Sequence, residues 1–218
     1  GAGYVGSRMA RTLRAEGHEV LAVGRKSEKL AALEAIGCRT MTIEASKLRA
    51  FQPVFYGQSS PIVLFTIPPI PNAPAGEVVR RAAEAATNVG CQRFLYLGST
   101  AVYGSTLSSE WVNEDSPTAL SDPDGAPRVA DEGTLETIRL AGLNTCVLRL
   151  AAIYGPGRGV RERLKKGSYQ LIDNGVHYFS RIHVDDIVGV ARAAVERAPS
   201  GALYCVADRL PSTQREYA

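Results

Sequence analysis

The sequence lacks long apolar segments and is poor in residues that bind metals. No apolar run approaches the about 18 residues of a membrane-spanning helix, so we expect no contact with a membrane. The four cysteines are far apart and form no C-x-x-C pair, and the three histidines show no ligand spacing. We therefore expect reduced thiols in a cytoplasmic protein, with neither a disulfide framework nor a metal site.

The sequence also lacks a block of charge of one sign. Its 25 lysines and arginines are spread along the chain and give a net charge of only +3 against 22 aspartates and glutamates. This excess is weak support for an anionic small ligand and does not form the basic stripe of a nucleic-acid-binding protein. We expect a small-molecule substrate and no nucleic acid, and we leave a homodimer open.

What is present is a regular alternation of strand and helix patterns. Asp185 is the expected N-cap of the last helix. The alternation predicts an α/β fold with a doubly wound parallel sheet of Rossmann type. Apolar, β-branched runs predict strands at 19–24, 40–43, 61–67, 93–98, 145–151 and 202–207. Helical patterns lie between them at 5–16, 27–36, 76–89, about 128–141 and about 186–197, and the first three stop at a glycine.

Two segments interrupt this alternation. Residues 104–127 are rich in Ser, Pro, Asp and Gly and predict a long loop, and residues 154–182 predict a loop-rich insertion. Long irregular segments after strands tend to cover a site. We therefore expect a Rossmann domain at 1–153 and a small C-terminal substrate region at 154–218. Residues 185–208 are expected to return to the Rossmann sheet, so that the two parts form one integrated unit.

The chain opens on a glycine motif. Gly1, Gly3 and Gly6 of "GAGYVG" form G-x-G-x-x-G, in which the glycines allow a tight turn, a close approach to a pyrophosphate and helix–strand packing. An amphipathic helix and a strand follow at the spacing of a βαβ unit, so this loop, with Tyr4 and Val5, is expected to bind a dinucleotide. A glycine turn without a ligand is the alternative. No strand precedes Gly1, so we expect the sequence to be trimmed there.

The strand at 19–24 ends in Gly24, followed by Arg25 and Lys26, where an NAD site usually has an acidic residue that binds the ribose 2′-hydroxyl. A guanidinium at this place would pair with a 2′-phosphate. The sequence therefore predicts NADP as the cofactor, with NAD as the second option, and two solvated surface cations are the alternative reading.

The third of these predicted strands runs into a proline-rich turn. The strand at 61–67 must end by Pro68, because proline cannot serve a central ladder. We expect Thr66, Ile67 and Pro68 to wall the cofactor cleft, and a plain loop is the alternative.

Four motifs in this order resemble those of extended short-chain dehydrogenases/reductases of the NAD-dependent epimerase/dehydratase family. They are "GAGYVG" (1–6), "LGSTAVYG" (97–104), "LRLAAIYGPGR" (148–158) and "RIHVDD" (181–186). The resemblance covers essentially the whole chain and implies a Rossmann domain with a small C-terminal substrate region. It also implies activity on sugar nucleotides or related alcohols and ketones. For His183 and Asp185 we favour capping and docking of the insertion over a metal or acid/base cluster.

The resemblance implies that Ser99 is the serine that orients the substrate oxygen. It also implies a catalytic Tyr-x-x-x-Lys pair at the start of the next helix. Residues 121–136 contain neither tyrosine nor lysine, and no tyrosine of the chain has a lysine four residues on. Aligning the helix puts Ala126 and Ala130 at the two positions. The chain therefore resembles an atypical branch that keeps the cofactor fold without the usual dyad.

Ser99 is expected to contact the nicotinamide or the substrate, and Tyr103 is the other candidate catalytic residue. Arg128, Asp131 and Glu132 are further acid/base candidates on the next helix. For all of these except Ser99, a structural role is the favoured alternative: packing for Tyr103, and a solvated helix face for the charges. The predicted function is an NAD(P)(H)-binding, epimerase/dehydratase-like oxidoreductase, and the alternative is a non-catalytic regulatory protein that senses NADP.

Overall fold

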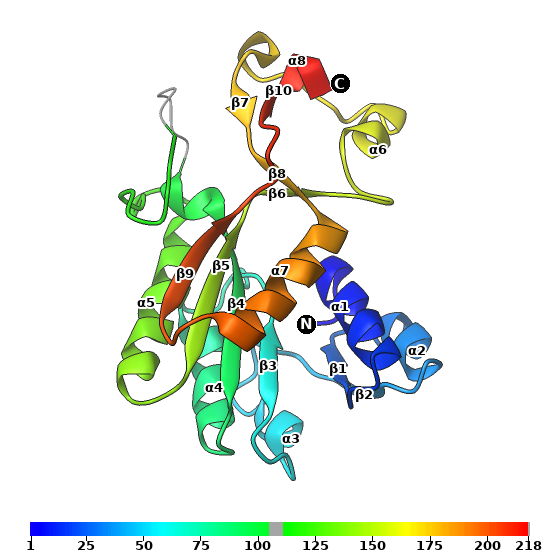
Figure 1. Cartoon of the computed structure of the whole chain (residues 1–218), viewed down its shortest axis with the longest axis vertical. Coiled ribbons are helices and arrows are strands. Elements are labelled where there is room, and N and C mark those ends of the chain that lie inside the picture. Colours follow the sequence, from blue (N-terminus) through cyan, green and yellow to red (C-terminus); the bar gives the residue numbers. More distant parts are fainter. Residues whose placement is uncertain (105–110, 218) are drawn as a thin grey trace.

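The sheet is the centre of the computed structural model, which describes residues 1–104 and 111–217. Its parallel strands run in the order β3 (Ile62–Phe65), β4 (Arg93–Ser99), β5 (Thr145–Leu150) and β9 (Ala202–Val206). β1 (Leu21–Gly24) and β2 (Arg39–Thr42) form a separate parallel pair on the side of β3 (Figure 1). The predicted parallel α/β fold of Rossmann type is confirmed, and all six predicted strands are present.

Helices cover both faces of this sheet. α1 (Tyr4–Ala15) and α7 (Val184–Arg197) pack on one face, and α4 (Glu77–Thr87) and α5 (Ala126–Leu140) pack on the other (Figure 1). α2 (Ser27–Glu34) packs against β1 and β2, and the short α3 (Gln52–Phe55) lies near α4. This arrangement leaves the strand ends as the edges at which loops and ligands can meet the sheet.

Strand β4 explains why the sequence shows continuous apolar runs. Leu95 and Leu97 pack in the core under α1 and α7, whereas Phe94 and Tyr96 pack in the core under α4 and α5. All four are buried. A strand covered on both faces needs no polar alternation, and each such side chain contributes about 1.5–3 kcal/mol on burial.

Three helices end at the glycines predicted from the sequence, whereas the predicted N-cap of α7 is wrong. Gly17, Gly37 and Gly90, which follow α1, α2 and α4, have φ of +88°, +85° and +69°. At α7 the expected N-cap, Asp185, is wrong. His183 is the N-cap, and its Nδ1 accepts a hydrogen bond from the Asp185 N–H at 3.4 Å. His183 has the extended backbone of a cap, while Asp185 already lies in the first helical turn.

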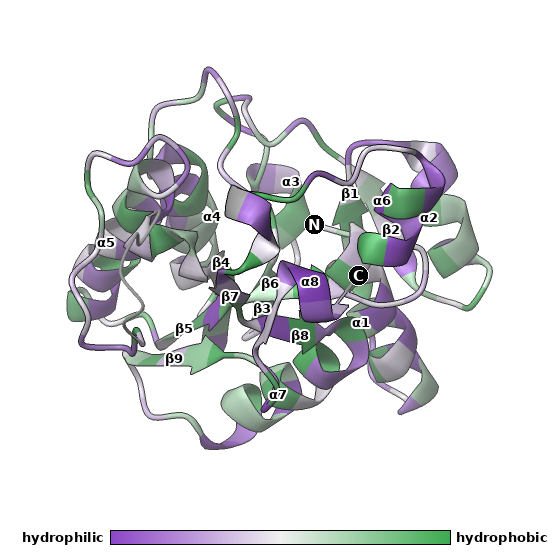
Figure 2. Cartoon of the chain, turned by 90° about the horizontal axis from the view of Figure 1, so that it is seen from above, coloured by the Kyte–Doolittle hydropathy of each residue, from purple (hydrophilic) through white to green (hydrophobic). Residues whose placement is uncertain are grey.

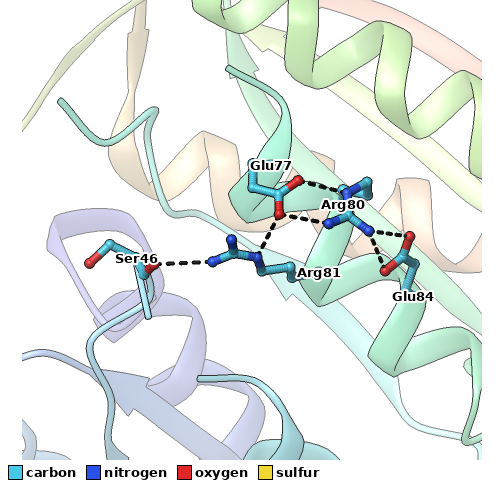
Figure 3. Close-up of polar contacts among 5 residues, drawn as sticks. All are labelled: Ser46, Glu77, Arg80, Arg81 and Glu84. Atoms are coloured by element: carbon cyan, nitrogen blue, oxygen red, sulfur yellow. Dashed lines mark hydrogen bonds and ion pairs between the residues drawn. The ribbon is translucent and has the colours of Figure 1, made fainter. Parts of the chain in front are cut away.

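A charged network on α4 fixes its outer side (Figure 3). Arg80 lies 2.6 Å from both Glu77 and Glu84, one turn away on either side. Arg81 bonds Glu77 at 2.8 Å and donates to the Ser46 carbonyl at 3.1 Å, which joins α4 to the segment after β2. Pairs of residues three or four apart on a helix contribute only about 0.3–0.5 kcal/mol each, so the network orients α4 more than it stabilises it.

The region after β5 contains short elements where the sequence predicted a loop-rich insertion. They gather at one end of the molecule, and α8 is hydrophilic in the view from that end (Figures 1 and 2). The paired strands are β6 (Ala152–Tyr154) with β8 (Arg181–His183), and β7 (Tyr178–Phe179) with β10 (Ser212–Thr213). The helices are α6 (Val160–Lys165), η2 (Asp173–Gly175) and α8 (Gln214–Tyr217). The division at residue 153 stays a prediction.

The long loop predicted at 104–127 follows the short helix η1 (Thr100–Tyr103). Residues 105–110 lie outside the described residues, and residues 111–125 form turns and irregular backbone up to the start of α5. Within the described part of the chain, no helix combines the length and the hydropathy required to cross a bilayer.

Candidate functional site

The glycine motif forms a loop that is closed on one side and open on the other. α1 follows Gly3, its N-cap, and no side chain caps the first helical turn. A Cβ at Gly6 would overlap the Gly1 carbonyl oxygen, whereas a Cβ at Gly3 would meet no atom within 4 Å. Gly6 is therefore required by the loop itself, and Gly3 leaves free space beside a helix N-terminus, the arrangement that accepts a phosphate.

The start of the chain bridges the ends of β1 and β3. The Ala2 N–H donates to the Val23 carbonyl at 2.6 Å, and the Thr66 hydroxyl donates to the Gly1 carbonyl. Ile67 Cγ1 would lie 3.0 Å from a Cβ at Gly1. The structure thus brings the glycine loop together with Thr66 and Ile67 at the carboxyl edge of the strands, where open α/β sheets bind ligands.

The cations expected to select the cofactor follow β1 directly. A Cβ at Gly24 would lie 3.1 Å from Leu30 Cδ2, so this glycine lets β1 pack on α2. Arg25 and Lys26 are exposed. Among the described residues, neither side chain has a hydrogen bond or an ion pair. Both are free to bind a phosphate, and the residues present fit a dinucleotide.

Tyr4 and Val5 have different places within the loop. Val5 packs in the core and is 8% exposed, so only its backbone amide can face a cofactor. The Tyr4 hydroxyl donates to the Pro156 carbonyl at 3.0 Å. The guanidinium groups of Arg8 and Arg158 lie 3.9 and 5.3 Å from the centre of the Tyr4 ring. The "YGPGR" turn therefore covers the glycine loop and adds positive charge beside it.

Ser99 ends β4 at the same edge as Thr66. Its Oγ accepts a hydrogen bond from the Ala101 N–H at 3.2 Å, which caps η1 and leaves the hydroxyl proton available. A Cβ at Gly125 would lie 2.5 Å from the Ala101 carbonyl oxygen, so the start of α5 packs directly against η1. Ser99 is thus next to the helix that the resemblance expects to carry the catalytic pair.

Tyr103 is held by the protein through its hydroxyl group. The hydroxyl donates to the Asn113 carbonyl at 2.7 Å and accepts from Arg149 Nη1 at 2.6 Å. The Cys205 sulfur lies 3.0 Å away. Burial raises the pKa of Tyr103 to about 12. These contacts support the packing alternative for Tyr103, and its catalytic role stays a prediction.

The acidic side chains of α5 do not lie on a solvated face, so that expectation is wrong for Asp131 and Glu132. Asp131 is 5% exposed and accepts a hydrogen bond from the Tyr96 hydroxyl at 2.8 Å. Glu132 forms an ion pair with Arg149 on β5 at 2.8 Å, and both side chains are nearly buried. Arg149 was not among the predicted site residues, although a cation inside the apolar run "TCVLRLA" was the available signal.

A cavity of about 360 Å³ adjoins the cofactor edge. It begins at Ile67 and Pro68, which we predict to line the cofactor cleft, and reaches Asp124, Arg128 and Asp131 at the start of α5. Among its described lining residues there is no tyrosine and no lysine. No group of three His, Cys, Asp or Glu residues in the described ranges is placed to hold a metal.

Comparisons with known proteins agree with this geometry. The NAD(P)H-binding family matches residues 1–188. A 3-diazoavenalumate denitrifying reductase from a Streptomyces species is 28% identical over 225 residues, which cover 94% of this chain and 73% of the relative. A conserved protein of unknown function from Silicibacter pomeroyi has a TM-score of 0.76 at 30% identity, covering 99% of this chain and 73% of that one.

A sugar-nucleotide enzyme shows the same fold at lower identity. A double mutant of dTDP-glucose 4,6-dehydratase from Streptomyces venezuelae, solved with NAD, has a TM-score of 0.83 at 21% identity. The match covers 99% of this chain and 76% of the dehydratase. With the glycine loop and the match over residues 1–188, this chain belongs to the NAD(P)H-binding family, with the fold of epimerase/dehydratase-type short-chain dehydrogenases/reductases.

Proposed function

We propose that this protein is an NADPH-dependent reductase of a small organic molecule. The observation that carries the proposal is the glycine loop, which Thr66 holds at the carboxyl edge of the sheet and which is open beside Gly3. A bound dinucleotide would supply a hydride there. Arg25 and Lys26 support NADPH over NADH, because a 2′-phosphate would give them an anionic partner.

The surroundings of the loop favour a reduction that does not depend on a phenolic proton donor. The described lining of the cavity holds no tyrosine–lysine pair, and the Tyr103 hydroxyl is occupied by Asn113 and Arg149. The similarity to a protein named as a denitrifying reductase supports reductase chemistry. Sugar nucleotides and related alcohols or ketones form the wider substrate class that the resemblance implies.

A binding and turnover series tests this function. NADPH and NADH are titrated by nicotinamide fluorescence, and oxidation of bound NADPH is then followed with panels of carbonyl compounds, aromatic electrophiles and sugar nucleotides. We expect NADPH to bind more tightly and at least one panel member to be reduced. Failure to bind either dinucleotide would overturn the proposal.

The rival function is a non-catalytic sensor of NADP, and the missing tyrosine–lysine pair is the observation in its favour. A sensor would bind NADPH and change its hydrogen-exchange pattern without oxidising it. Tight binding with no turnover across all panels would therefore decide for the sensor.

A further inference from the structure

Arg128 differs from the other charged groups around the cavity at the start of α5. Its Nε is buried without a hydrogen-bond partner, and no ion pair of its guanidinium occurs within the described residues. Arg128 is the only cation among the described residues that line the cavity. A buried donor without a partner costs about 1–3 kcal/mol, so an oxygen-bearing ligand in the cavity would relieve that cost.

The acidic residues of the same cavity are already committed or exposed. Asp131 accepts a hydrogen bond from Tyr96 at 2.8 Å and a second from the Gly76 amide. Asp124 lies in the exposed turn before α5, where its backbone N–H is bonded to Asp122. Arg128 favours the charged form of Asp131 electrostatically, but neither carboxylate lies within ion-pair distance of its guanidinium. The guanidinium therefore keeps hydrogen-bonding capacity for a ligand.

Part of the remaining lining is apolar and stiff. Phe65, Ile67, Ile70 and Val79 contribute apolar side chains, and six of the lining residues are prolines. Its volume of about 360 Å³ lies at the lower end of the range for small-molecule pockets. A small ligand with an apolar part and one anionic end matches this lining, because a guanidinium pairs with a carboxylate through two parallel hydrogen bonds.

We propose that the cavity beside the start of α5 binds the substrate as a small organic carboxylate, with Arg128 as the partner of the carboxylate group. This inference rests on the proposed reductase function, since it names the substrate class of that site. The cavity starts at Ile67, whose side chain also approaches Gly1 of the glycine loop. A ligand held there would therefore share Ile67 with the expected cofactor cleft.

Direct binding tests the proposal without turnover. The NADP⁺-loaded protein is titrated by calorimetry with benzoate, trans-cinnamate and 2-naphthoate, and with the primary amide of each. We expect at least one carboxylate to bind about 10-fold or more tightly than its amide. Arg128→Gln should weaken carboxylate binding by a similar factor and leave the amide unchanged. Arg139→Gln, in the last turn of the same helix, where the half-buried guanidinium is paired with Glu136, is the control and should change neither affinity.

Three results would overturn the proposal. They are the absence of binding by every carboxylate, equal affinity for carboxylate and amide, and an Arg128→Gln variant that loses NADP⁺ affinity while keeping carboxylate affinity. If Arg128→Gln fails to fold, Arg128→Lys and the comparison of carboxylate with amide in the parent still decide. Carboxylate binding without NADPH oxidation would instead count against the reductase function and leave this site standing.

Discussion

At the scale of single residues, the same residue type has different roles at different places in the fold. Gly6 is needed because the Gly1 carbonyl fills the space of a side chain, whereas Gly3 faces open space. Arg25 is exposed with no partner among the described residues, while Arg149 is buried and paired with Glu132. Burial and partners, more than residue type, therefore decide which of these groups can reach a ligand.

Arg25 is predicted to set the choice between NADPH and NADH. A charge-assisted hydrogen bond contributes about 1.5–3 kcal/mol, which corresponds to a roughly 10- to 100-fold preference for NADPH. Arg25→Asp should reverse the preference, because a carboxylate repels the 2′-phosphate and can bind a ribose hydroxyl. Fluorescence titration with both dinucleotides measures this. Arg39→Asp, at the opposite end of the β1–β2 pair, is the control, and equal affinities in the parent would refute the prediction.

Gly3 and Gly6 are predicted to fail in different ways. Gly3 has an extended backbone with φ of −85°, so Gly3→Val should fold and lose detectable NADPH binding. Gly6→Ala forces the loop apart and should lower the free energy of unfolding by about 1–3 kcal/mol. Urea denaturation and NADPH titration on both variants separate the two effects. Unchanged NADPH affinity in Gly3→Val would place the dinucleotide elsewhere.

At the scale of elements, a hydrogen bond and an ion pair connect α5 to the sheet. Tyr96 on β4 bonds Asp131, and Arg149 on β5 bonds Glu132. Removing one partner of a buried ion pair typically costs about 3–5 kcal/mol, so these contacts fix the position of α5 on β4 and β5. Arg128 lies one turn before Glu132, and its place at the cavity depends on this fixed position.

Asp131 is predicted to make stability depend on pH. Burial raises the pKa of Asp131, and hydrogen bonds from Tyr96 and the Gly76 amide offset only part of that rise. The folded state therefore holds the proton more tightly than the unfolded state. The resulting stability is complete below the ordinary carboxyl pKa of 3.8 and is lost as the pH rises through the higher folded value.

Asp131→Asn should remove that part of the pH dependence while keeping a hydrogen-bond acceptor for Tyr96. Urea denaturation of both proteins from acidic to neutral pH measures the difference. Relative to the variant, the parent should lose stability as the pH rises. Asp115→Asn, at an exposed position, should follow the parent, and parallel curves for parent and Asp131→Asn would contradict the prediction.

At the scale of the whole molecule, the start of the chain joins two groups of paired strands. Among the described residues, β1 pairs with β2, and β3 pairs with β4. Residues 1–2 connect β1 and β3 at their carboxyl ends. A dinucleotide bound at the glycine loop would contact both groups of strands. The homodimer left open by the sequence stays a prediction.

NADPH is therefore predicted to stabilise the protein as a unit. At a concentration of about 100 times its Kd, a ligand that binds only the folded state adds about 2.7 kcal/mol. For a chain of this size, that corresponds to an increase in Tm of about 5–11 °C. Thermal unfolding with and without NADPH measures the shift. Gly3→Val should show none, and a parent Tm that is insensitive to saturating NADPH would contradict the prediction.

The sequence by itself determined the order and type of the main elements. Local information suffices for these: apolar runs predict β3 to β5, glycines with positive φ end α1, α2 and α4, and the glycine motif predicts the cofactor loop. Each of these signals spans only a few neighbouring residues. The same is true of the cations that follow β1.

Only the tertiary structure decided what the polar residues contact. Arg149 meets Glu132 and Tyr103, which are 17 and 46 residues away in the chain, and this contact determines that the Tyr103 hydroxyl is occupied. The cavity at Arg128 forms where residues 67–76 pack near the start of α5. The short strands β6 and β8 pair with each other although they are distant in the sequence. Burial and pairing depend on contacts between distant segments, and local patterns carry no record of those contacts.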